Sequence, residues 1–227
     1  MKGLFWKEWS ILTRSYKQIV LFLVVIYGAL GIAMGQTTMA YALQVVFSIM
    51  VTSTIAFDEN SHWDAYARTL PVTPSQIVGC KYLFGLGGLA AGSVLAALII
   101  ALSNLLDKPI LIYHTVDKVG AIDLAAALLV CGSLSLLFVG LILPLSYCFN
   151  SARARSSIFL VFGAFGLLIG AAVAALPDRT RGTVFAFLNS SPDEVILPWL
   201  AVAFAVMLAL YGVSYKICVE IYTKKEY

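Results

Sequence analysis

The sequence predicts an all-α integral membrane protein with six transmembrane helices, preceded by an N-terminal amphipathic helix. Apolar residues make up 61% of the 227 residues, and charged residues only 12%, about half of the ~25% found in soluble domains. A soluble domain of this length leaves too much surface in contact with water to hide so many apolar side chains. The same composition also argues against a disordered chain or a nucleic-acid-binding protein, whereas the net charge of +3 is too small to indicate anything alone.

Six apolar segments approach or exceed the ~20 residues that cross the hydrocarbon core of a bilayer. They are Ile19–Gly35, Thr38–Phe57, Tyr82–Leu106, Ala121–Phe149, Ser157–Leu176 and Ile196–Tyr215. Pro144 lies inside the fourth segment and predicts a kink, because a neighbouring helix can satisfy the carbonyl that proline frees. No repeat or low-complexity linker divides the chain, so residues 1–227 are expected to form a single membrane domain.

The distribution of lysine and arginine predicts the orientation. Eleven of these residues fall on one side of the six spans: Lys2, Lys7, Arg14, Lys17, Arg68, Lys81, Arg153, Arg155, Lys216, Lys224 and Lys225. The other side has four, namely Lys108, Lys118, Arg179 and Arg181. The positive-inside rule therefore places both termini in the cytoplasm of a multi-pass plasma-membrane protein, in agreement with the even number of spans.

Residues 1–18 have the pattern of an amphipathic helix. At 100° per residue, one arc of about 60° contains Phe5, Trp9, Leu12 and Tyr16. The nearly opposite face contains Lys7, Ser10, Arg14 and Lys17. This pattern favours a helix lying in the headgroup plane; the alternative is a charged cap that only fixes the topology.

The cytoplasmic loop 58–81 is the most informative segment outside the spans. Ser61-x-x-Asp64 resembles a capping box and predicts a short helix through Arg68, which Leu70-Pro71 ends. Thr73-Pro74-Ser75-Gln76 then predicts the start of a second helix that continues into the third span. A helical hairpin needs only about 2–8 residues to reverse, so the length favours a docking element over a simple connection.

On the outer side, residues 178–195 contain the apolar run Val184–Leu188. The run is too short to span and too apolar for an exposed loop, which favours short interfacial or re-entrant helices.

The sequence has no recognisable catalytic or metal-binding pattern. His62 has no second ligand at a useful spacing, and the four cysteines are far apart. The adjacent Asp58 and Glu59 are more typical of a helix-start or docking charge than of an acid–base pair. The four cysteines are Cys80, Cys131, Cys148 and Cys218.

The spans contain almost no ionisable residue, which argues against an ion-coupled carrier. The sequence also lacks the Gly-rich phosphate-binding loop of ATPases, so active transport would need energy from a partner. Small-residue motifs start at Gly31, Gly88 and Gly166, and they fit dimerisation and packing within the chain equally well.

These features together resemble the type-two permease subunits of ABC exporters, in particular small bacterial members that export phenol-soluble-modulin-like peptides, lantibiotics or drugs. The matching residues are Phe57, Glu59, Trp63, Tyr66, Leu70-Pro71-Val72, Ile77-Val78 and Lys81-Tyr82. The architectural resemblance covers the whole chain, and the matching residues about one eighth of it.

The resemblance implies two permease chains, forming a homodimer, above two copies of a separate ATPase that binds ATP and magnesium. Spans two and five of each chain would face each other around the pathway. A coupling helix at 58–68 would dock on the ATPase through Asp58, Glu59, Trp63, Tyr66, Arg68, Leu70 and Pro71. The connecting helix 1–18 would use Phe5, Trp9, Leu12 and Tyr16, and an outer gate at 179–190 would contain Phe185, Phe187 and Leu188.

This chain itself would be no enzyme and would hold no cofactor or metal. Its expected partners besides the ATPase are membrane lipid and a hydrophobic small molecule or amphipathic peptide that is exported, with no nucleic acid. The alternatives are a non-transporting scaffold or assembly factor, and a passive channel.

Overall fold

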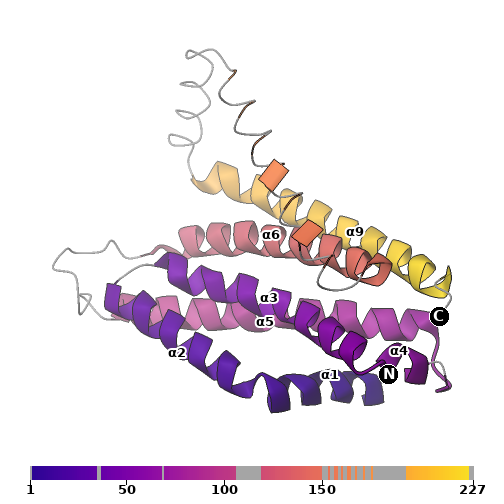
Figure 1. The fold of residues 1–227 in the computed structure, drawn as a ribbon. Helices are drawn as coiled ribbons and strands as arrows, with labels where there is room; N and C mark the ends of the chain where they lie inside the picture. Colours follow the sequence, from indigo (N-terminus) through magenta and orange to yellow (C-terminus); the bar gives the residue numbers. More distant parts are fainter. Residues whose placement is uncertain are drawn as a thin grey trace.

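The computed structural model describes residues 2–34, 37–67, 69–105, 119–149 and 193–224, together with scattered positions between 153 and 175. All regular structure in these ranges is helical (Figure 1). The helices are α1 (Lys2–Ser15), α2 (Lys17–Met34), α3 (Thr37–Asn60), α4 (Trp63–Ala67), α5 (Pro74–Leu105), α6 (Ala121–Cys148) and α9 (Asp193–Lys224).

Four of these helices are long and apolar enough to cross a membrane, namely α3, α5, α6 and α9. The pair α1 and α2 is bent by 69° at Tyr16 and counts as a fifth span if it is taken as one broken segment. The helices confirm an all-α membrane protein, and α2 coincides with the first predicted span. Most of the fifth predicted span, Ser157–Leu176, lies outside the described residues, so six spans stay a prediction.

The four long helices α3, α5, α6 and α9 lie side by side along one long axis (Figure 1). Helix α3 packs on α5 and α6, α6 packs on α9, and α2 lies against α3. Helices α6 and α9 end close to each other, and the rings of Tyr147 and Tyr222 near these ends are 5.4 Å apart. The start of α1, the short α4 and the end of α9 are at the same end of the bundle, which we call the α4 end.

Two glycines allow α3 and α5 to approach closely. A Cβ atom on Gly88 would lie 2.4 Å from the carbonyl oxygen of Phe47, and one on Gly92 would lie 2.6 Å from the Cα of Gln44. Backbone atoms cannot yield as a flexible side chain can, so only glycine fits at these two positions. The Gly88-x-x-x-Gly92 motif therefore packs helices within the chain. Of the two roles that the sequence left open, dimerisation and packing within the chain, the structure shows the second for this motif.

Helix α6 continues through Pro144, and the structure provides the substitute hydrogen bond that the sequence predicted. Proline has no N–H to offer the carbonyl four residues earlier, which belongs to Gly140. The hydroxyl of Ser214 on α9 donates to that carbonyl at 2.5 Å, and also lies 2.7 Å from the hydroxyl of Tyr82 on α5. One serine thus joins α5, α6 and α9.

We expect Gly88→Ala to lower the free energy of unfolding by about 1–3 kcal/mol, because the added methyl forces α3 away from α5. The matched control is Gly87→Ala, whose Cβ would meet nothing within 4 Å and which should be neutral or stabilising through helix propensity. Thermal unfolding of both variants in detergent measures the difference, and equal midpoints would contradict this account of the helix contact.

Candidate functional site

The chain reverses at the α4 end through a compact protrusion, residues 61–73. Helix α3 ends at Asn60, where the Ser61 hydroxyl donates to the Asp58 carbonyl at 3.2 Å. His62 has φ 53°, a left-handed conformation that reverses the chain and is rare outside glycine. Ser61 therefore closes α3. The predicted capping box also needs the Asp64 side chain, which lies outside the described residues.

The second half of the protrusion follows the prediction closely. After α4, Thr69–Thr73 form a tight corner, and α5 begins at Pro74. The backbone N–H of Thr73 donates to the Gln76 side chain at 3.3 Å, which is one half of a capping box. The predicted short helix, corner and new helix are all present, with the short helix described as Trp63–Ala67.

Four charged side chains meet beneath the protrusion, and we call them the ion cluster: Lys7 and Glu8 from α1, Asp58 from α3 and Lys81 from α5. The Lys81 ammonium is 2.8 Å from Glu8 Oε1 and 2.6 Å from Asp58 Oδ2. Its third hydrogen bond goes to the Thr54 hydroxyl at 3.1 Å. Lys7 Nζ contacts Asp58 Oδ1 at 2.5 Å and Glu8 Oε1 at 3.1 Å.

The ion cluster is balanced in charge and almost completely buried. Glu8, Asp58 and Lys81 are all buried, so each charge has lost most of its hydration and depends on its partners. Burial by itself raises the pKa of Glu8, but attraction to Lys81 and Lys7, together with hydrogen bonding to Lys81 and Thr54, outweighs it and holds the pKa below its ordinary value. Ionised Glu8 thus stabilises the fold at neutral pH, and this stabilisation is lost as the pH falls through its lowered pKa.

Trp63 connects the ion cluster to the protrusion. The Lys7 ammonium lies 4.3 Å from the centre of the Trp63 ring, within the range of a cation–π contact. The Trp63 and Tyr66 rings are 5.4 Å apart, and Ala67 at the end of α4 is fully buried. The inner side of α4 is therefore held against α1, while Tyr66 is 57% exposed on the outer side.

The structure separates the seven predicted coupling residues by exposure. Tyr66 and Pro71 are exposed, whereas Asp58 is buried in the ion cluster and is not available at the surface. Arg68 lies outside the described residues. The remaining three, which are half-buried, are Glu59, Trp63 and Leu70.

Helix α1 presents its predicted aromatic face to the bundle. Phe5, Trp9 and Leu12 line a groove against α5, with the Phe5 and Phe84 rings 5.9 Å apart. Tyr16 lies at the bend. Lys7, on the opposite face, does not point into solvent alone, because its ammonium contacts Asp58 and Glu8.

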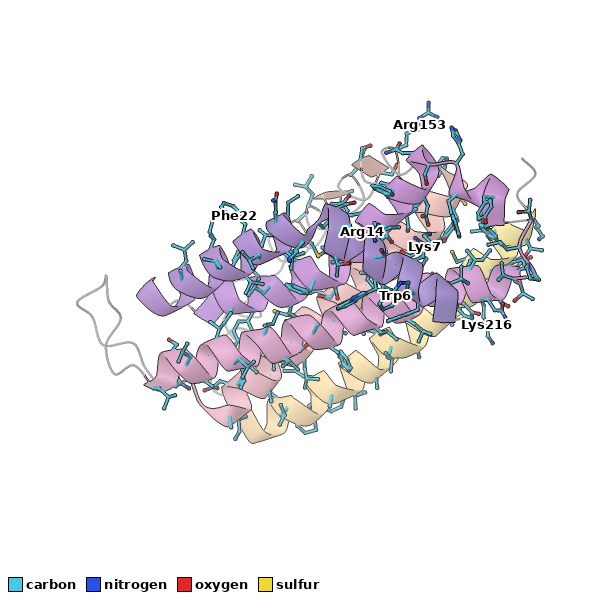
Figure 2. All side chains as sticks on the ribbon, turned by 90° about the horizontal axis from the view of Figure 1, so that it is seen from below. Trp6, Lys7, Arg14, Phe22, Arg153 and Lys216 are labelled. Carbon is cyan, nitrogen blue, oxygen red and sulfur yellow. The ribbon has the colours of Figure 1, made fainter. Side chains whose placement is uncertain are left out.

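Sequence reasoning missed Trp6, which is 71% exposed. Trp6, Ser10 and Arg14 of α1, together with Phe57 of α3, line a shallow depression of about 390 Å³ beside Lys7. Figure 2 shows Trp6, Lys7 and Arg14 along this helix. The sequence did contain an indication, because Trp6 directly follows Phe5 but lies outside the arc that Phe5 shares with Trp9, Leu12 and Tyr16.

Glu8 and Lys81 were also missed as a pair. Each is the charged member of a largely apolar local pattern, with Leu4 and Ile11 around Glu8 and Ile77–Tyr82 around Lys81. A lone charge in such a pattern suggests a buried partner, but the sequence could not show which residue that partner would be.

Within the described ranges, no three His, Cys, Asp or Glu side chains form a group that could hold a metal ion. The predicted outer-gate residues Phe185, Phe187 and Leu188 lie outside the described residues.

Residues 3–223 match the protein family described as ABC-2 family transporter protein. The chain belongs to this family. No curated protein and no solved structure shows significant similarity to it. The match confirms the resemblance to type-two ABC permeases and identifies a multi-pass membrane subunit of an ABC transporter, which implies an ABC ATPase as partner.

We expect Lys81→Met to destabilise this permease by about 3–5 kcal/mol, because two buried carboxylates would then share one lysine. Glu8→Gln should also be destabilising, whereas the double variant should cost less than the sum of the two, since it leaves the neutral Lys7–Asp58 pair. Thermal unfolding of the parent protein, the two single variants and the double variant gives the four free energies of this double-mutant cycle.

Lys224→Met is the control, because its ion pair with Glu220 is exposed and its loss should not change the unfolding midpoint. Strictly additive costs for Lys81→Met and Glu8→Gln would contradict a cooperative ion cluster.

Proposed function

We propose that this chain is the membrane subunit of an ATP-driven exporter, and that its ATPase docks on a surface with two parts. One part is the outer side of the protrusion, with Tyr66 and Pro71. The other is the exposed side of α1, with Trp6 and Arg14. We call the two together the docking face. Large aromatic and arginine side chains are the residues that most often dominate protein interfaces.

The observation that carries this proposal is the ion cluster. A partner that pushes on the protrusion moves α4, which is held to α1 by the Lys7–Trp63 contact. Lys7 and Glu8 of α1 are in turn bound to α3 through Asp58 and to α5 through Lys81. The ion cluster therefore joins both parts of the docking face to two long helices, so that motion of a docked ATPase reaches the spans.

The wider assembly follows the family expectation. Two copies of this chain would form the pathway, and two ATPase chains would bind ATP and magnesium. The α4 end would face the cytoplasm, in line with the positive-inside bias and with the clustering of both chain ends there. Spans with almost no ionisable side chain suit an amphipathic peptide or a hydrophobic small molecule as exported cargo.

We expect Trp6→Ala to weaken binding of the co-encoded ATPase by about thirtyfold, because truncation of a tryptophan that dominates an interface costs about 2 kcal/mol. Trp199→Ala is a closely matched control: Trp199 is 73% exposed, compared with 71% for Trp6, and lies near the start of α9 at the other end of the bundle. Binding is measured by titrating purified ATPase onto the permease in nanodiscs. Equal affinities for the two variants would remove α1 from the docking face.

The exporter assignment predicts protection of cells against part of a panel of amphipathic peptides and hydrophobic drugs when the chain and its ATPase are expressed together. An ATPase variant unable to hydrolyse ATP should abolish the protection, because the permease has no phosphate-binding loop of its own. Uptake or leakage of these compounds with the permease alone would instead indicate a passive channel. Indifference to the whole panel would favour a scaffold.

A further inference from the structure

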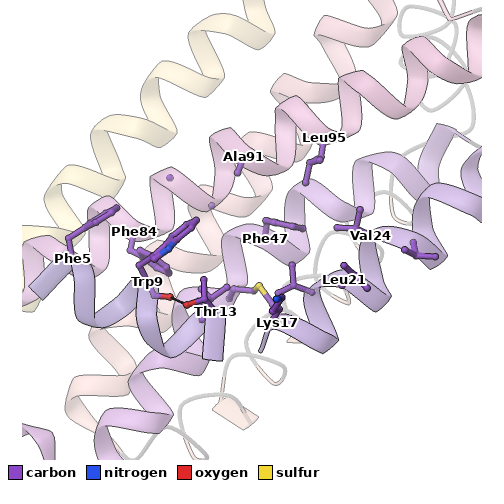
Figure 3. A pocket seen from close by; sticks show the side chains of 16 residues that line it. Phe5, Trp9, Thr13, Lys17, Leu21, Val24, Phe47, Phe84, Ala91 and Leu95 are labelled. Carbon is purple, nitrogen blue, oxygen red and sulfur yellow. Dashed lines mark hydrogen bonds between the residues drawn. The ribbon is translucent and has the colours of Figure 1, made fainter. Parts of the chain in front are cut away.

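An apolar groove lies between the bent α1–α2 pair and the helices α3 and α5, on a side of the molecule not used by the docking face. Its volume is about 560 Å³. The groove exists because the chain bends by 69° at Tyr16, so that the α1–α2 corner stands away from α5 (Figure 1). Figure 3 shows Phe84, Ala91 and Leu95 of α5 along it, facing the side chains of α1 and α2.

The groove is open at the surface of the bundle. Leu21 and Val25 on its α2 wall are 63% and 58% exposed, and Ala91 on its α5 wall is exposed as well. Apolar side chains that are exposed on the membrane-spanning part of a helix are in contact with lipid hydrocarbon. The groove thus offers a lipid chain more contact than a convex helix surface does.

The length of the groove matches one leaflet. Measured from the bend, its lining on α2 extends from Lys17 to Val25, and eight residues at ~1.5 Å each give about 12 Å. Half of a ~30 Å hydrocarbon core is about 15 Å. A single acyl chain that starts at the bend would therefore follow the groove through most of one leaflet, between α2 and the part of α5 that contains Ala91 and Leu95.

The polar corner of the groove carries positive charge. Lys17 and Thr13 are the polar side chains of the lining, and they come from the α1–α2 corner (Figure 3). The Thr13 hydroxyl already donates to the Trp9 carbonyl at 2.9 Å. Lys17 is exposed, and none of the described carboxylates forms an ion pair with it. Its ammonium is thus available to a phosphate group.

We propose that this groove is a binding site for an anionic phospholipid of the leaflet at the α4 end. One acyl chain would lie between α2 and α5, and the headgroup phosphate would pair with Lys17. The cytoplasmic leaflet is rich in anionic lipids, which matches the side on which the positive-inside bias places Lys17. This inference does not depend on the exporter assignment.

The test uses the full-length chain in nanodiscs that contain phosphatidylglycerol with a photoreactive group on its acyl chain. We expect cross-links to map to the groove walls on α2 and α5. Ala91→Trp fills the groove and should reduce these adducts at least fivefold, whereas Val206→Trp, at an exposed position on α9, should leave them unchanged.

A second comparison tests the headgroup. Lys17→Gln should lower labelling by phosphatidylglycerol about fivefold, since one lysine near an anionic lipid contributes about 1 kcal/mol. It should not affect the zwitterionic phosphatidylcholine analogue. Lys216→Gln, another cation at the surface of the bundle (Figure 2), serves as the control and should change neither.

Three results would overturn the proposal. Unchanged groove adducts in Ala91→Trp would show that the lipid lies elsewhere, and equal labelling by both lipids with no effect of Lys17→Gln would remove the headgroup assignment. A disulfide between two copies of the Ala91→Cys variant in the membrane would identify a second chain as the occupant. The surface variant Lys17→Gln keeps the test valid if Ala91→Trp does not fold.

Discussion

The buried ion cluster is the constraint on which the α4 end of this permease depends. Buried charges are costly unless each is paired and hydrogen-bonded, and here two lysines and two carboxylates neutralise one another. The Lys81 ammonium uses all three of its hydrogen-bond donors on Glu8, Asp58 and Thr54. Because these partners come from three helices, α1, α3 and α5 cannot separate at this end without exposing unpaired charges to an apolar surrounding.

The rest of the described bundle is held by forces other than ion pairs. Away from the ion cluster, α3 and α5 approach through Gly88 and Gly92. Ser214, together with Pro144, joins α6 to α9 through the carbonyl of Gly140. These contacts are close packing and neutral hydrogen bonds, which suit a hydrocarbon surrounding.

The helices were predictable because membrane spans and caps are local patterns in the sequence. The start of α5 at Pro74 was predictable because proline favours the first position of a helix. The need of the Gly140 carbonyl for a donor from another helix was predictable because Pro144 has no N–H. The ion cluster was not predictable, since Lys7 and Asp58 are 51 residues apart and neither has a neighbour in the sequence that indicates burial. The positive-inside rule counts every lysine as a loop charge, whereas Lys7 and Lys81 are bound to buried acids, so the orientation stays a prediction.

Helix α1 takes part in both proposed sites, and the geometry determines how these sites are related. Lys7 and Glu8 bind one side of α1 to α3 and α5, while Phe5 and Trp9 on another side form part of the groove wall. Beyond the bend, α2 is held against α3 and α5. A Cβ atom on Gly28 of α2 would lie 3.7 Å from the Cδ1 atom of Ile99 on α5. Both arms of the bent pair are therefore anchored, so the groove is a fixed feature of the fold. Any motion that α1 makes with a docked ATPase must either carry the groove wall with it or change the bend at Tyr16.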